Sequence, residues 1–236
     1  RFSKLIIMDG KNLVENKLTD SHWFIETMER GAKIVVIAPE YGPPSTKADY
    51  WIPIRPQTDA ALWLGVTRLM IENKWYDEAF VKAFTDFPLL VRTDTLKRLR
   101  AHEVVPGYRT TLAADGPSMK VQGLTAAQHA KLGDYVVWDE KAKAMRAVTR
   151  DDMGASMAAK GIAAALTGTF KVRLVDGMEV EVATLWTLYQ THLKDYDLDT
   201  VAEITHAPKD LIRQLAQDIG TLRPVGIHQG EGINHW

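Results

Sequence analysis

The sequence predicts an α/β fold, with a doubly wound, mainly parallel sheet, helices on both of its faces and an irregular insertion that contains a β-hairpin. Three observations support this prediction. Strand-like and helix-like patterns alternate through the first 90 residues. The strand-like runs at 5–8 and 32–38 are apolar without polar alternation, as in strands that are buried on both faces. Between 170 and 182, two alternating runs flank Asp176-Gly177, which is the strongest hairpin signal in the chain.

The first 90 residues follow the order of a parallel βαβ arrangement. Thr19, Asp20 and Ser21 are helix-start signals and Gly31 is a stop signal, so a helix is predicted over 22–30. A loop is predicted at 41–45, after the strand that Pro39 ends. The further elements predicted in this part are a strand at 50–54 and helices at 59–73 and 77–84.

The rest of the chain is less regular before helices return. Residues 91–107 mix basic and acidic side chains, which is more typical of a solvated face than of an anion site, and 108–133 resemble a loop. Later elements are predicted as two strands within 135–148, helices at 184–194, 200–205 and 211–219, the last with Pro208 in its first turn, and a strand at 224–228. The whole of 1–236 is therefore assigned to one α/β domain, with a first βαβ half at 1–90, an insertion at 91–180 and helices returning to the sheet at 181–236.

Composition is that of an ordinary globular protein. Hydrophobic residues make up 46% and charged residues 25% of the 236 residues, which excludes disorder of the whole chain. The net charge of −1 argues against a nucleic-acid partner, and the short apolar runs argue against direct membrane insertion. The 236 residues contain no cysteine, so they hold no disulfide, thiol nucleophile or cysteine-bound iron–sulfur cluster.

Polar residues follow each of the first three predicted strands. Gly10 and Asn12 follow the first strand, Glu40 follows the second, and Thr58 and Asp59 lie between the third strand and a helix. Open α/β sheets hold nucleotides at the carboxyl ends of their strands, where a carboxylate can accept paired N–H donors from a guanine edge. The structural alternatives are a plain turn at Gly10, an exposed loop acid at Glu40, and helix capping by Thr58 or Asp59.

Other catalytic patterns are missing from the sequence. The seven histidines are dispersed without metal-ligand spacing, and no metal site or Ser-His-Asp arrangement is predicted. The Gly-x-Gly-x-x-Gly fingerprint follows neither of the first two strands, which counts against a simple NAD-binding domain. The chain closes on a glycine-rich turn at 230–236 that could hold a ligand, and it is expected to be a piece of a longer polypeptide.

Taken together, these junctions resemble the molybdopterin oxidoreductases of the dimethyl sulfoxide reductase type. The resemblance rests on Gly10-x-Asn12, on Pro39-Glu40-Tyr41 and above all on residues 48–62 (ADYWIPIRPQTDAAL). Further pieces occur in the family's order at 164–168 (AALTG), 176–177 (DG), 207–212 (APKDLI) and 230–235 (GEGINH). Residues 86–94 (DFPLLVRTD), 96–100 (LKRLR) and the Asn234-His235-Trp236 ending are similar to the branch that acts on nitrate, nitrite, chlorate, perchlorate and selenate.

The resemblance implies part of the catalytic alpha subunit of a nitrite oxidoreductase or nitrate reductase, which acts by oxygen-atom transfer. It also implies a bis-molybdopterin guanine dinucleotide cofactor that carries molybdenum. The cofactor-binding roles that it implies are the guanine edge for Asp59 with Thr58, ribose for Glu40, the diphosphate for Gly10 and Asn12, and a pterin for Asn234 and His235, with Pro39, Gln57 and Gly232 completing the set. No catalytic residue is assigned with certainty, although Asn234 and His235 are candidates.

One residue departs from the family pattern. The family usually has glycine where this chain has Gln57, and glutamine is expected to require a negative φ and to bring an amide into the loop. The geometry at the guanine end is therefore expected to differ.

The resemblance also implies parts that lie outside these residues. The molybdenum ligand and a cysteine-bound iron–sulfur cluster are expected upstream, so the 236 residues alone are expected to be inactive. An iron–sulfur beta subunit and a haem or membrane electron-transfer subunit are the implied partners, and the periplasm or the periplasmic side of the membrane is the implied location. The alternatives are a chlorate, perchlorate or selenate reductase of the same family, a Rossmann-type nucleotide-binding enzyme, and a cofactor-free interaction module.

Overall fold

The computed structural model describes residues 2–110, 134–149, 151–152 and 154–230. The chain forms two compact units, one made of residues 1–76 and 192–236 and the other of residues 77–191. The second unit contains the whole of 91–180 and extends beyond it at both ends. Each unit has its own sheet and its own hydrophobic core, and each is described by itself.

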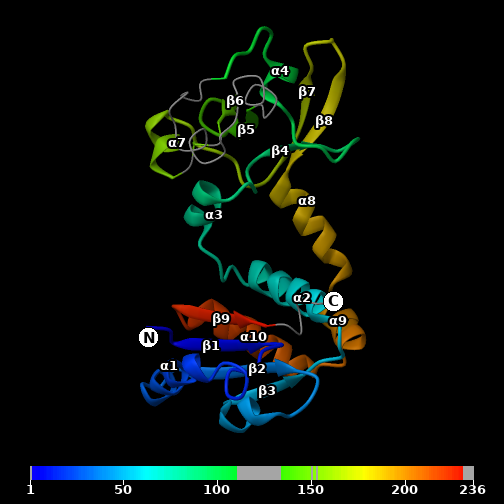
Figure 1. Ribbon diagram of the computed structural model, residues 1–236. Helices are drawn as coiled ribbons and strands as arrows, with labels where there is room; N and C mark the ends of the chain where they lie inside the picture. Colours follow the sequence, from blue (N-terminus) through cyan, green and yellow to red (C-terminus); the bar gives the residue numbers. More distant parts are fainter. Residues whose placement is uncertain (1, 111–133, 150, 153, 231–236) are drawn as a thin grey trace. The chain divides into compact units, whose positions relative to one another are not determined.

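The first unit is built on a parallel sheet with the strand order β3-β2-β1-β9 (Figure 1). Its strands are β1 (Leu5–Asp9), β2 (Lys33–Ala38), β3 (Tyr50–Pro53) and β9 (Val225–Gln229). Its helices are α1 (Leu18–Glu29), α2 (Asp59–Glu72), α9 (Leu198–Thr205) and α10 (Lys209–Thr221), with short 3-10 helices η1 (Pro43–Lys47) and η2 (Leu193–Asp195). The predicted mainly parallel α/β fold is confirmed.

Alternate residues of the strands enter two different cores, which explains the continuous apolar runs. Leu5 and Ile7 of β1 pack with α2, α9 and α10 on one face, whereas Ile6 and Met8 pack with Phe24 of α1 on the other. Helices therefore cover both faces of the sheet, so the doubly wound arrangement follows directly from strands whose both sides are apolar.

The beginning of α1 differs from the prediction. The helix starts at Leu18, so Thr19 and Asp20 lie in its first turn and cap nothing. Ser21 explains the difference, because its hydroxyl donates to the carbonyl of Leu18 at 2.7 Å within the helix and does not accept a terminal N–H group. Gly31 does end the helix, with φ +86°, as the sequence predicts.

A partly buried ion pair closes the amino edge of the sheet. Lys33 at the start of β2 places its Nζ 2.7 Å from Oδ2 of Asp218 on α10, and the Tyr50 hydroxyl donates to the same oxygen at 2.9 Å. Burial and the Asp218 charge raise the pKa of the Tyr50 hydroxyl above its ordinary value. These polar groups satisfy one another, so this edge has a structural role.

The second unit is antiparallel. A three-stranded sheet has the order β4-β8-β7, and a two-stranded sheet pairs β5 with β6. Its strands are β4 (Leu90–Arg92), β5 (Tyr135–Asp139), β6 (Ala144–Val148), β7 (Thr169–Arg173) and β8 (Glu179–Thr184), and its helices are α3 (Glu78–Phe84), α4 (Ala101–Val104), α7 (Ala155–Ala159) and α8 (Leu185–His192). The hairpin around Asp176-Gly177 is confirmed, with Gly177 at φ +89°. β4, α4 and α7 are not predicted from the sequence, because each has at most five residues, too few to show a repeating hydrophobic pattern.

Candidate functional site

The carboxyl edge of the parallel sheet is the place where its strand ends can form a ligand site. All four strands run in the same direction, so the segments after Asp9, Ala38, Pro53 and Gln229 emerge at one edge. The chain proceeds outward from β1 to β2 and β3, whereas β9 lies on the opposite side of β1. The reversal puts a topological switch point between β1 and β9, which is where such sheets bind ligands.

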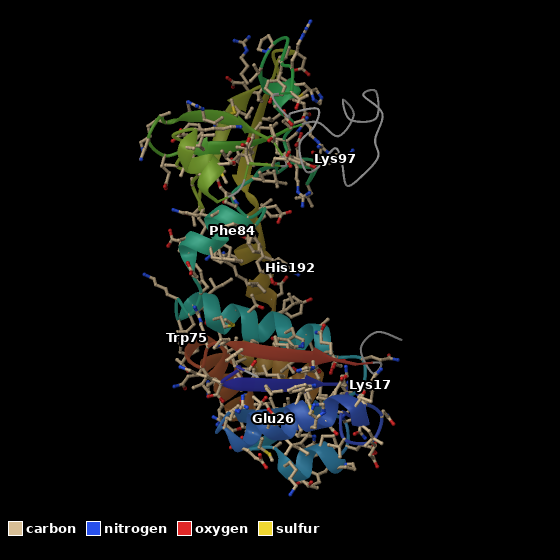
Figure 2. All side chains as sticks on the ribbon, turned by 60° about the vertical axis from the view of Figure 1, so that its left-hand side comes forward. Lys17, Glu26, Trp75, Phe84, Lys97 and His192 are labelled. Carbon is tan, nitrogen blue, oxygen red and sulfur yellow. The ribbon has the colours of Figure 1, made fainter. Side chains whose placement is uncertain are left out.

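A hollow of about 340 Å³ lies at this switch point. Among the described residues its lining contains three amides, two lysines and two glycines and no acid, namely Gly10, Lys11, Asn12, Asn16, Lys17, Gln229 and Gly230. Figure 2 shows Lys17 beside the end of the sheet where β9 ends. Positive charge combined with glycine backbone that a ligand can approach suits a phosphate group.

Two glycines shape the floor of this hollow. Gly10 has φ +59° and donates its N–H to the Ile37 carbonyl at 3.0 Å, which turns the chain sharply after β1. Gly230 donates its N–H to the Asp9 carbonyl at 3.1 Å, and a Cβ at this position would lie 2.6 Å from Cβ of Lys11. The close contact between the ends of β1 and β9 therefore requires glycine at position 230.

Asn12 has a local role in the same loop. Its Oδ1 accepts the backbone N–H of Glu15 at 3.0 Å, and its amide nitrogen donates to the Glu15 carboxylate. The side chain thus holds the loop after β1 in shape, and Asn12 also lines the hollow together with Gly10. The predicted pair Gly10 and Asn12 does meet at one site, although the Asn12 amide forms hydrogen bonds within the loop.

The segment after β2 carries Pro39 and Glu40 in exposed positions. Trp51 fixes the end of this strand, because its Nε1–H donates to the Ala38 carbonyl at 3.0 Å. The Tyr41 ring meets the Trp51 ring edge-on at a centroid distance of 5.4 Å. Glu40 is thereby placed at the carboxyl edge with its carboxylate in solvent.

The expectation that Gln57 needs a negative φ is wrong. Gln57 adopts φ +69°, which is the left-handed conformation that glycine takes most readily. The neighbouring backbone is tethered, because the Arg55 N–H donates to the Thr205 carbonyl at 2.8 Å and the Thr58 N–H donates to Arg55 at 3.3 Å. The loop keeps a glycine-type backbone at this position and bears the steric cost.

The capping interpretation of Thr58 and Asp59 is wrong as well. Thr58 occupies the residue before α2, but its hydroxyl donates to the Arg55 carbonyl at 2.6 Å and accepts no helix N–H. Asp59 is the first residue of α2, is half-buried, and caps nothing. Its carboxylate therefore remains available at the helix N-terminus, where a negative charge is favoured.

Asp9 is a member of the site that the sequence analysis did not single out. It is the last residue of β1 and is fully buried, and its Oδ2 accepts the Trp63 Nε1–H at 2.6 Å. Its Oδ1 is buried and has no hydrogen-bond donor among the described residues. Burial raises the pKa of the Asp9 carboxyl to about 7; the Trp63 hydrogen bond opposes this, and the neighbouring Asp59 carboxyl adds to it. A carboxylate at the last position of an apolar strand was the signal that could have revealed it.

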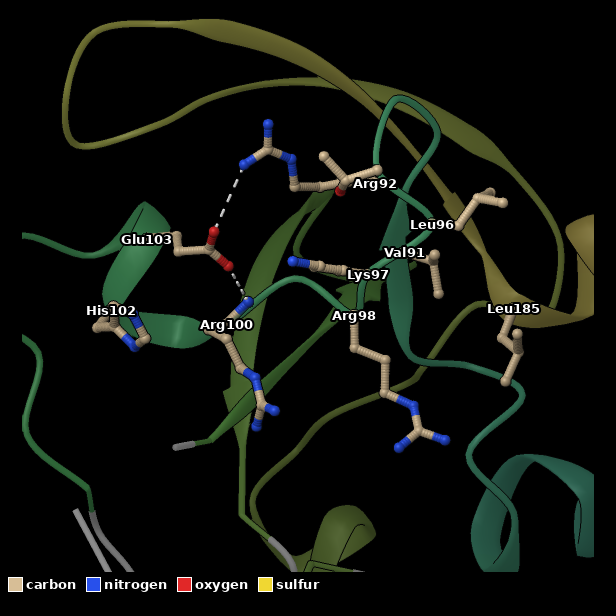
Figure 3. A pocket seen from close by; sticks show the side chains of 10 residues that line it. Val91, Arg92, Leu96, Lys97, Arg98, Arg100, His102, Glu103 and Leu185 are labelled. Carbon is tan, nitrogen blue, oxygen red and sulfur yellow. Dashed lines mark hydrogen bonds and ion pairs between the residues drawn. The ribbon is translucent and has the colours of Figure 1, made fainter. Parts of the chain in front are cut away.

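A second hollow of about 720 Å³ lies within the 77–191 unit (Figure 3). Its basic side chains are largely compensated, because Arg92 lies 2.7 Å from Asp94 and 3.5 Å from Glu103, and Arg98 pairs with Asp86. The Arg98 and Arg100 guanidinium groups also lie over the Tyr135 ring, at 5.6 and 4.4 Å from its centroid. This pattern supports the interpretation of 91–107 as a solvated charged face.

Some predicted features lie outside the residues that the structure describes. Gly232, Asn234 and His235 belong to this group. Within the described ranges, no cluster of three histidine, aspartate or glutamate side chains could hold a metal ion. Over the same ranges, no helix has both the length and the apolar character that crossing a membrane requires.

Comparison with known families shows to which family the chain belongs. The family described as "Molybdopterin oxidoreductase" matches residues 2–236. The chain belongs to this family. The predicted resemblance to the dimethyl sulfoxide reductase type is thereby confirmed, and the chain is a molybdopterin oxidoreductase domain over its length.

Curated relatives of this molybdopterin oxidoreductase chain are alpha subunits of several reductases. It is 31% identical to perchlorate reductase subunit alpha of Dechloromonas aromatica, over 99% of this chain and 25% of that protein. It is 29% identical to respiratory nitrate reductase subunit alpha of Haloferax mediterranei, over 98% and 22% respectively. It is 28% identical to chlorate reductase subunit alpha of Ideonella dechloratans, over 97% and 22%. The chain therefore spans about a quarter of the length of these relatives.

A solved structure agrees with the fold of the molybdopterin oxidoreductase chain. Acetylene hydratase from Pelobacter acetylenicus superposes with a TM-score of 0.51 at 19% identity, over 98% of this chain and 18% of that one. At this identity the likeness speaks for the fold alone. It supports the α/β arrangement described above.

Proposed function

We propose that this chain is part of the catalytic subunit of a molybdenum oxidoreductase, and that the carboxyl edge of its parallel sheet binds the guanine nucleotide arm of a bis-molybdopterin guanine dinucleotide cofactor. The family match over residues 2–236 supports a molybdopterin cofactor. The observation that carries the nucleotide assignment is the gathering of two chemically distinct groups at one edge of the sheet. One group offers donors and positive charge, and the other offers carboxylate oxygens.

The donor group fits a diphosphate. Lys11 and Lys17 supply positive charge, Gly10 leaves the backbone open, and no acid lines the hollow among the described residues. We assign the diphosphate to Gly10 and Asn12, as their position after β1 at the switch point suggests. Glu40, exposed at the end of the neighbouring strand β2, is assigned to the ribose hydroxyls, and Pro39 holds the chain direction there.

The acceptor group fits the edge of a guanine base. Guanine presents adjacent N–H donors, and a carboxylate accepts such a pair with both oxygens. Asp59 is half-buried at the N-terminus of α2 and caps nothing, so its carboxylate is available for this contact. Thr58 and Gln57 precede it in the same loop and complete the guanine end. Asn234 and His235 remain proposed pterin contacts.

We propose a nitrogen oxyanion as the substrate, with oxygen-atom transfer as nitrite oxidation or nitrate reduction. The similarity to a respiratory nitrate reductase subunit alpha supports this proposal. Chlorate or perchlorate is the second candidate substrate, because the similarity to the perchlorate and chlorate reductase alpha subunits is equally extensive. Selenate is a further candidate substrate in this second group. The chemistry at molybdenum is supplied by the cofactor, and the described residues bind and orient its nucleotide end.

Partner subunits are proposed on similar grounds. The relatives are named alpha subunits, which supports an assembly with further subunits. We propose an iron–sulfur beta subunit and a haem or membrane electron-transfer subunit as those partners, with further iron–sulfur chemistry in the rest of the catalytic chain. The periplasm, or the periplasmic side of the membrane, is the proposed location.

Cofactor analysis of the full-length protein tests the proposal directly. The expected result is molybdenum together with guanine nucleotide, each measured per polypeptide, and turnover of nitrite or nitrate above that of chlorate, perchlorate and selenate. Bound NAD in place of guanine nucleotide would support a Rossmann-type enzyme, and the absence of any nucleotide would support an interaction module. Faster turnover of chlorate or perchlorate would transfer the substrate assignment to the second candidate.

A further inference from the structure

A buried carboxyl group lies directly beneath the proposed guanine contact. Asp9 is 0% exposed at the end of β1, and its Oδ2 accepts the Trp63 Nε1–H at 2.6 Å. Its other oxygen, Oδ1, is buried and meets no donor among the described residues. Asp59 lies one turn before Trp63 on the same face of α2, and its carboxyl is the neighbouring titratable group that acts on Asp9. A buried acceptor without a donor is costly, so this arrangement requires an explanation.

A proton held between the Asp9 and Asp59 carboxyl groups explains why the buried Asp9 oxygen has no donor. Ionised carboxylates only accept hydrogen bonds, so Asp9 and Asp59 can bond to each other only when one of them is protonated. Like charges in a shared site favour this state, because both groups cannot ionise at close range without strong repulsion. Asp9 is the more deeply buried of the two and is the better carrier of the proton, while Asp59 reaches partly into solvent.

No opposite charge relieves the pair among the described residues. In the sheet, Asp9 lies in register with Ile37 of β2 and Gln229 of β9, which are both uncharged. From α2 it faces Trp63 and Asp59, and it takes part in no ion pair. Lys11, in the following loop, acts on His228: burial and the Lys11 charge lower the pKa of that imidazole. Without an opposite charge to stabilise two ionised carboxylates, the Asp9–Asp59 pair retains a proton.

We propose that Asp9 and Asp59 form a proton-sharing carboxyl pair in which Asp9 carries the proton and donates it to Asp59. The inference rests on the proposed function, in which Asp59 binds the guanine edge. The Asp9 O–H bonds to the Asp59 carboxylate and fixes its direction, so that the outer lone pairs face the ligand's adjacent N–H donors. Asp9 thus acts as a positioning residue and touches no ligand itself. Its raised pKa, about 7 through burial, agrees with a proton held up to neutral pH.

Two substitutions at Asp9 in the full-length holoprotein separate positioning from general structure. Asp9→Asn keeps an N–H donor toward Asp59 and an acceptor for Trp63, so it reproduces the protonated form. Guanine nucleotide and molybdenum content are expected to stay within twofold of the wild type. Asp9→Leu removes both functions and is expected to reduce nucleotide retention at least fivefold. Equal losses in the two variants would overturn the proposal.

Infrared difference spectroscopy reads the proton itself. The wild type at pH 6 is expected to show a protonated-carboxyl C=O band that shifts in D₂O and fades with a midpoint near pH 7. Asp9→Asn is expected to abolish it. Asp59→Asn is expected to move its midpoint to lower pH, because the introduced amide relieves the repulsion and can donate to an ionised Asp9, while burial still favours the proton. Trp63→Phe removes a hydrogen bond that lowers the pKa of Asp9, so the midpoint should move to higher pH.

These readouts keep the two proposals apart. A midpoint that Asp59→Asn leaves unchanged, or a band that is missing from the wild type at pH 6, would overturn proton sharing whatever the nucleotide content. Full nucleotide retention in Asp59→Asn would overturn the guanine contact, while the infrared band still reports on the pair. Because the spectrum does not require turnover, neither result depends on the activity of the loaded enzyme.

Discussion

Asp59 stands at a helix start without capping it, which leaves its carboxylate for the proposed guanine contact. Its side chain is half-buried at the first residue of α2, and Thr58 directs its own hydroxyl back to the Arg55 carbonyl at 2.6 Å. The helix fixes the Cα–Cβ direction of Asp59, and the buried carboxyl of Asp9 bonds to Trp63 one turn further along the same helix. A carboxylate that is oriented in this way loses little conformational entropy when it binds a base edge.

Removal of the Asp59 carboxylate is expected to weaken cofactor retention. In the full-length protein, Asp59→Ala should cost about 1–3 kcal/mol of cofactor binding, because the guanine donors lose their acceptor. The measurement is molybdenum and guanine nucleotide per polypeptide after dialysis. Asp77→Ala is the matched control, since Asp77 caps α3 by accepting the Phe80 N–H at 2.9 Å. It should cost about 1 kcal/mol of stability and leave cofactor content unchanged. Wild-type occupancy in Asp59→Ala would contradict the assignment.

Gln57 is the residue at which the backbone conformation and the side chain disagree. Its φ of +69° is one that glycine adopts without steric cost, whereas other residues lose roughly 1–2 kcal/mol there. The tether between Arg55 and the Thr205 carbonyl holds the loop in this conformation at 2.8 Å.

Gln57→Gly is expected to raise the free energy of unfolding by up to about 1 kcal/mol, since relief of the strain exceeds the added entropy of the unfolded chain. Urea unfolding of the full-length protein measures this change. The same substitution at Gln214, which is exposed in the middle of α10, should instead cost about 0.5–1 kcal/mol. Equal destabilisation by both substitutions would show that the backbone of Gln57 is not strained.

At the scale of elements, α2 is held by a close contact with α9. A Cβ on Gly65 would lie 2.6 Å from Cγ2 of Val201, which is much closer than real carbon atoms approach. Val201 is fully buried in the core that also contains Leu62, Ile212 and Leu215. The glycine lets the two helices approach, and this contact places the N-terminus of α2 against the carboxyl edge of the sheet.

Gly65→Ala is therefore expected to destabilise the protein by about 1–3 kcal/mol, although alanine favours helices over glycine by about 1 kcal/mol. Val201→Ala alone should cost roughly 2 kcal/mol through the cavity that it leaves. The double variant should be at least about 1 kcal/mol more stable than the sum of the two single effects, because each change makes room for the other. Chemical unfolding of the four proteins gives this coupling, and simple additivity would contradict the contact.

At the scale of the whole molecule, Asp9 gives stability an unusual pH dependence. Its pKa is raised to about 7 in the folded state, chiefly by burial, and returns to 3.8 on unfolding. The folded chain therefore binds more protons between these values, and stability falls as pH rises from about 4 through 7. A carboxyl with a lowered pKa acts in the opposite direction. At Asp139, burial is outweighed by backbone N–H groups of Ala142, Lys141 and Ala163, so its stabilisation is lost only as the pH falls through its lowered pKa.

Asp9→Asn is expected to remove this loss of stability above pH 4. The shift corresponds to about 4 kcal/mol at full ionisation, so the wild type should lose up to that amount relative to Asp9→Asn between pH 4 and pH 8. Unfolding of the cofactor-free full-length protein across this range gives the difference. Parallel pH profiles of the two proteins would show that Asp9 has an ordinary pKa.

Much of the parallel sheet, and the hairpin of the second unit, could be predicted because their signals are local. The apolar runs in β1 and β2, the stop at Gly31 and the hairpin turn at Asp176-Gly177 each depend on residues close together in the sequence. The short elements β4, α4 and α7 were not predicted, because they depend on packing partners far along the chain. The start of α1 was predicted too late, because Ser21 bonds within its own helix turn and does not cap the helix.

The sequence by itself determined the fold class and the strand ends at which Gly10, Asn12, Glu40, Thr58 and Asp59 lie, since hydrophobic periodicity and turn residues act over a few positions. Only the tertiary structure decided that β9 pairs with β1, so that Gly230 closes the hollow after Gly10. Only it brought Asp9, Asp59 and Trp63 together, because the Trp63 to Asp9 bond spans 54 positions and burial has no local code. Long-range pairing and desolvation depend on the whole chain, and the properties of this site depend on both.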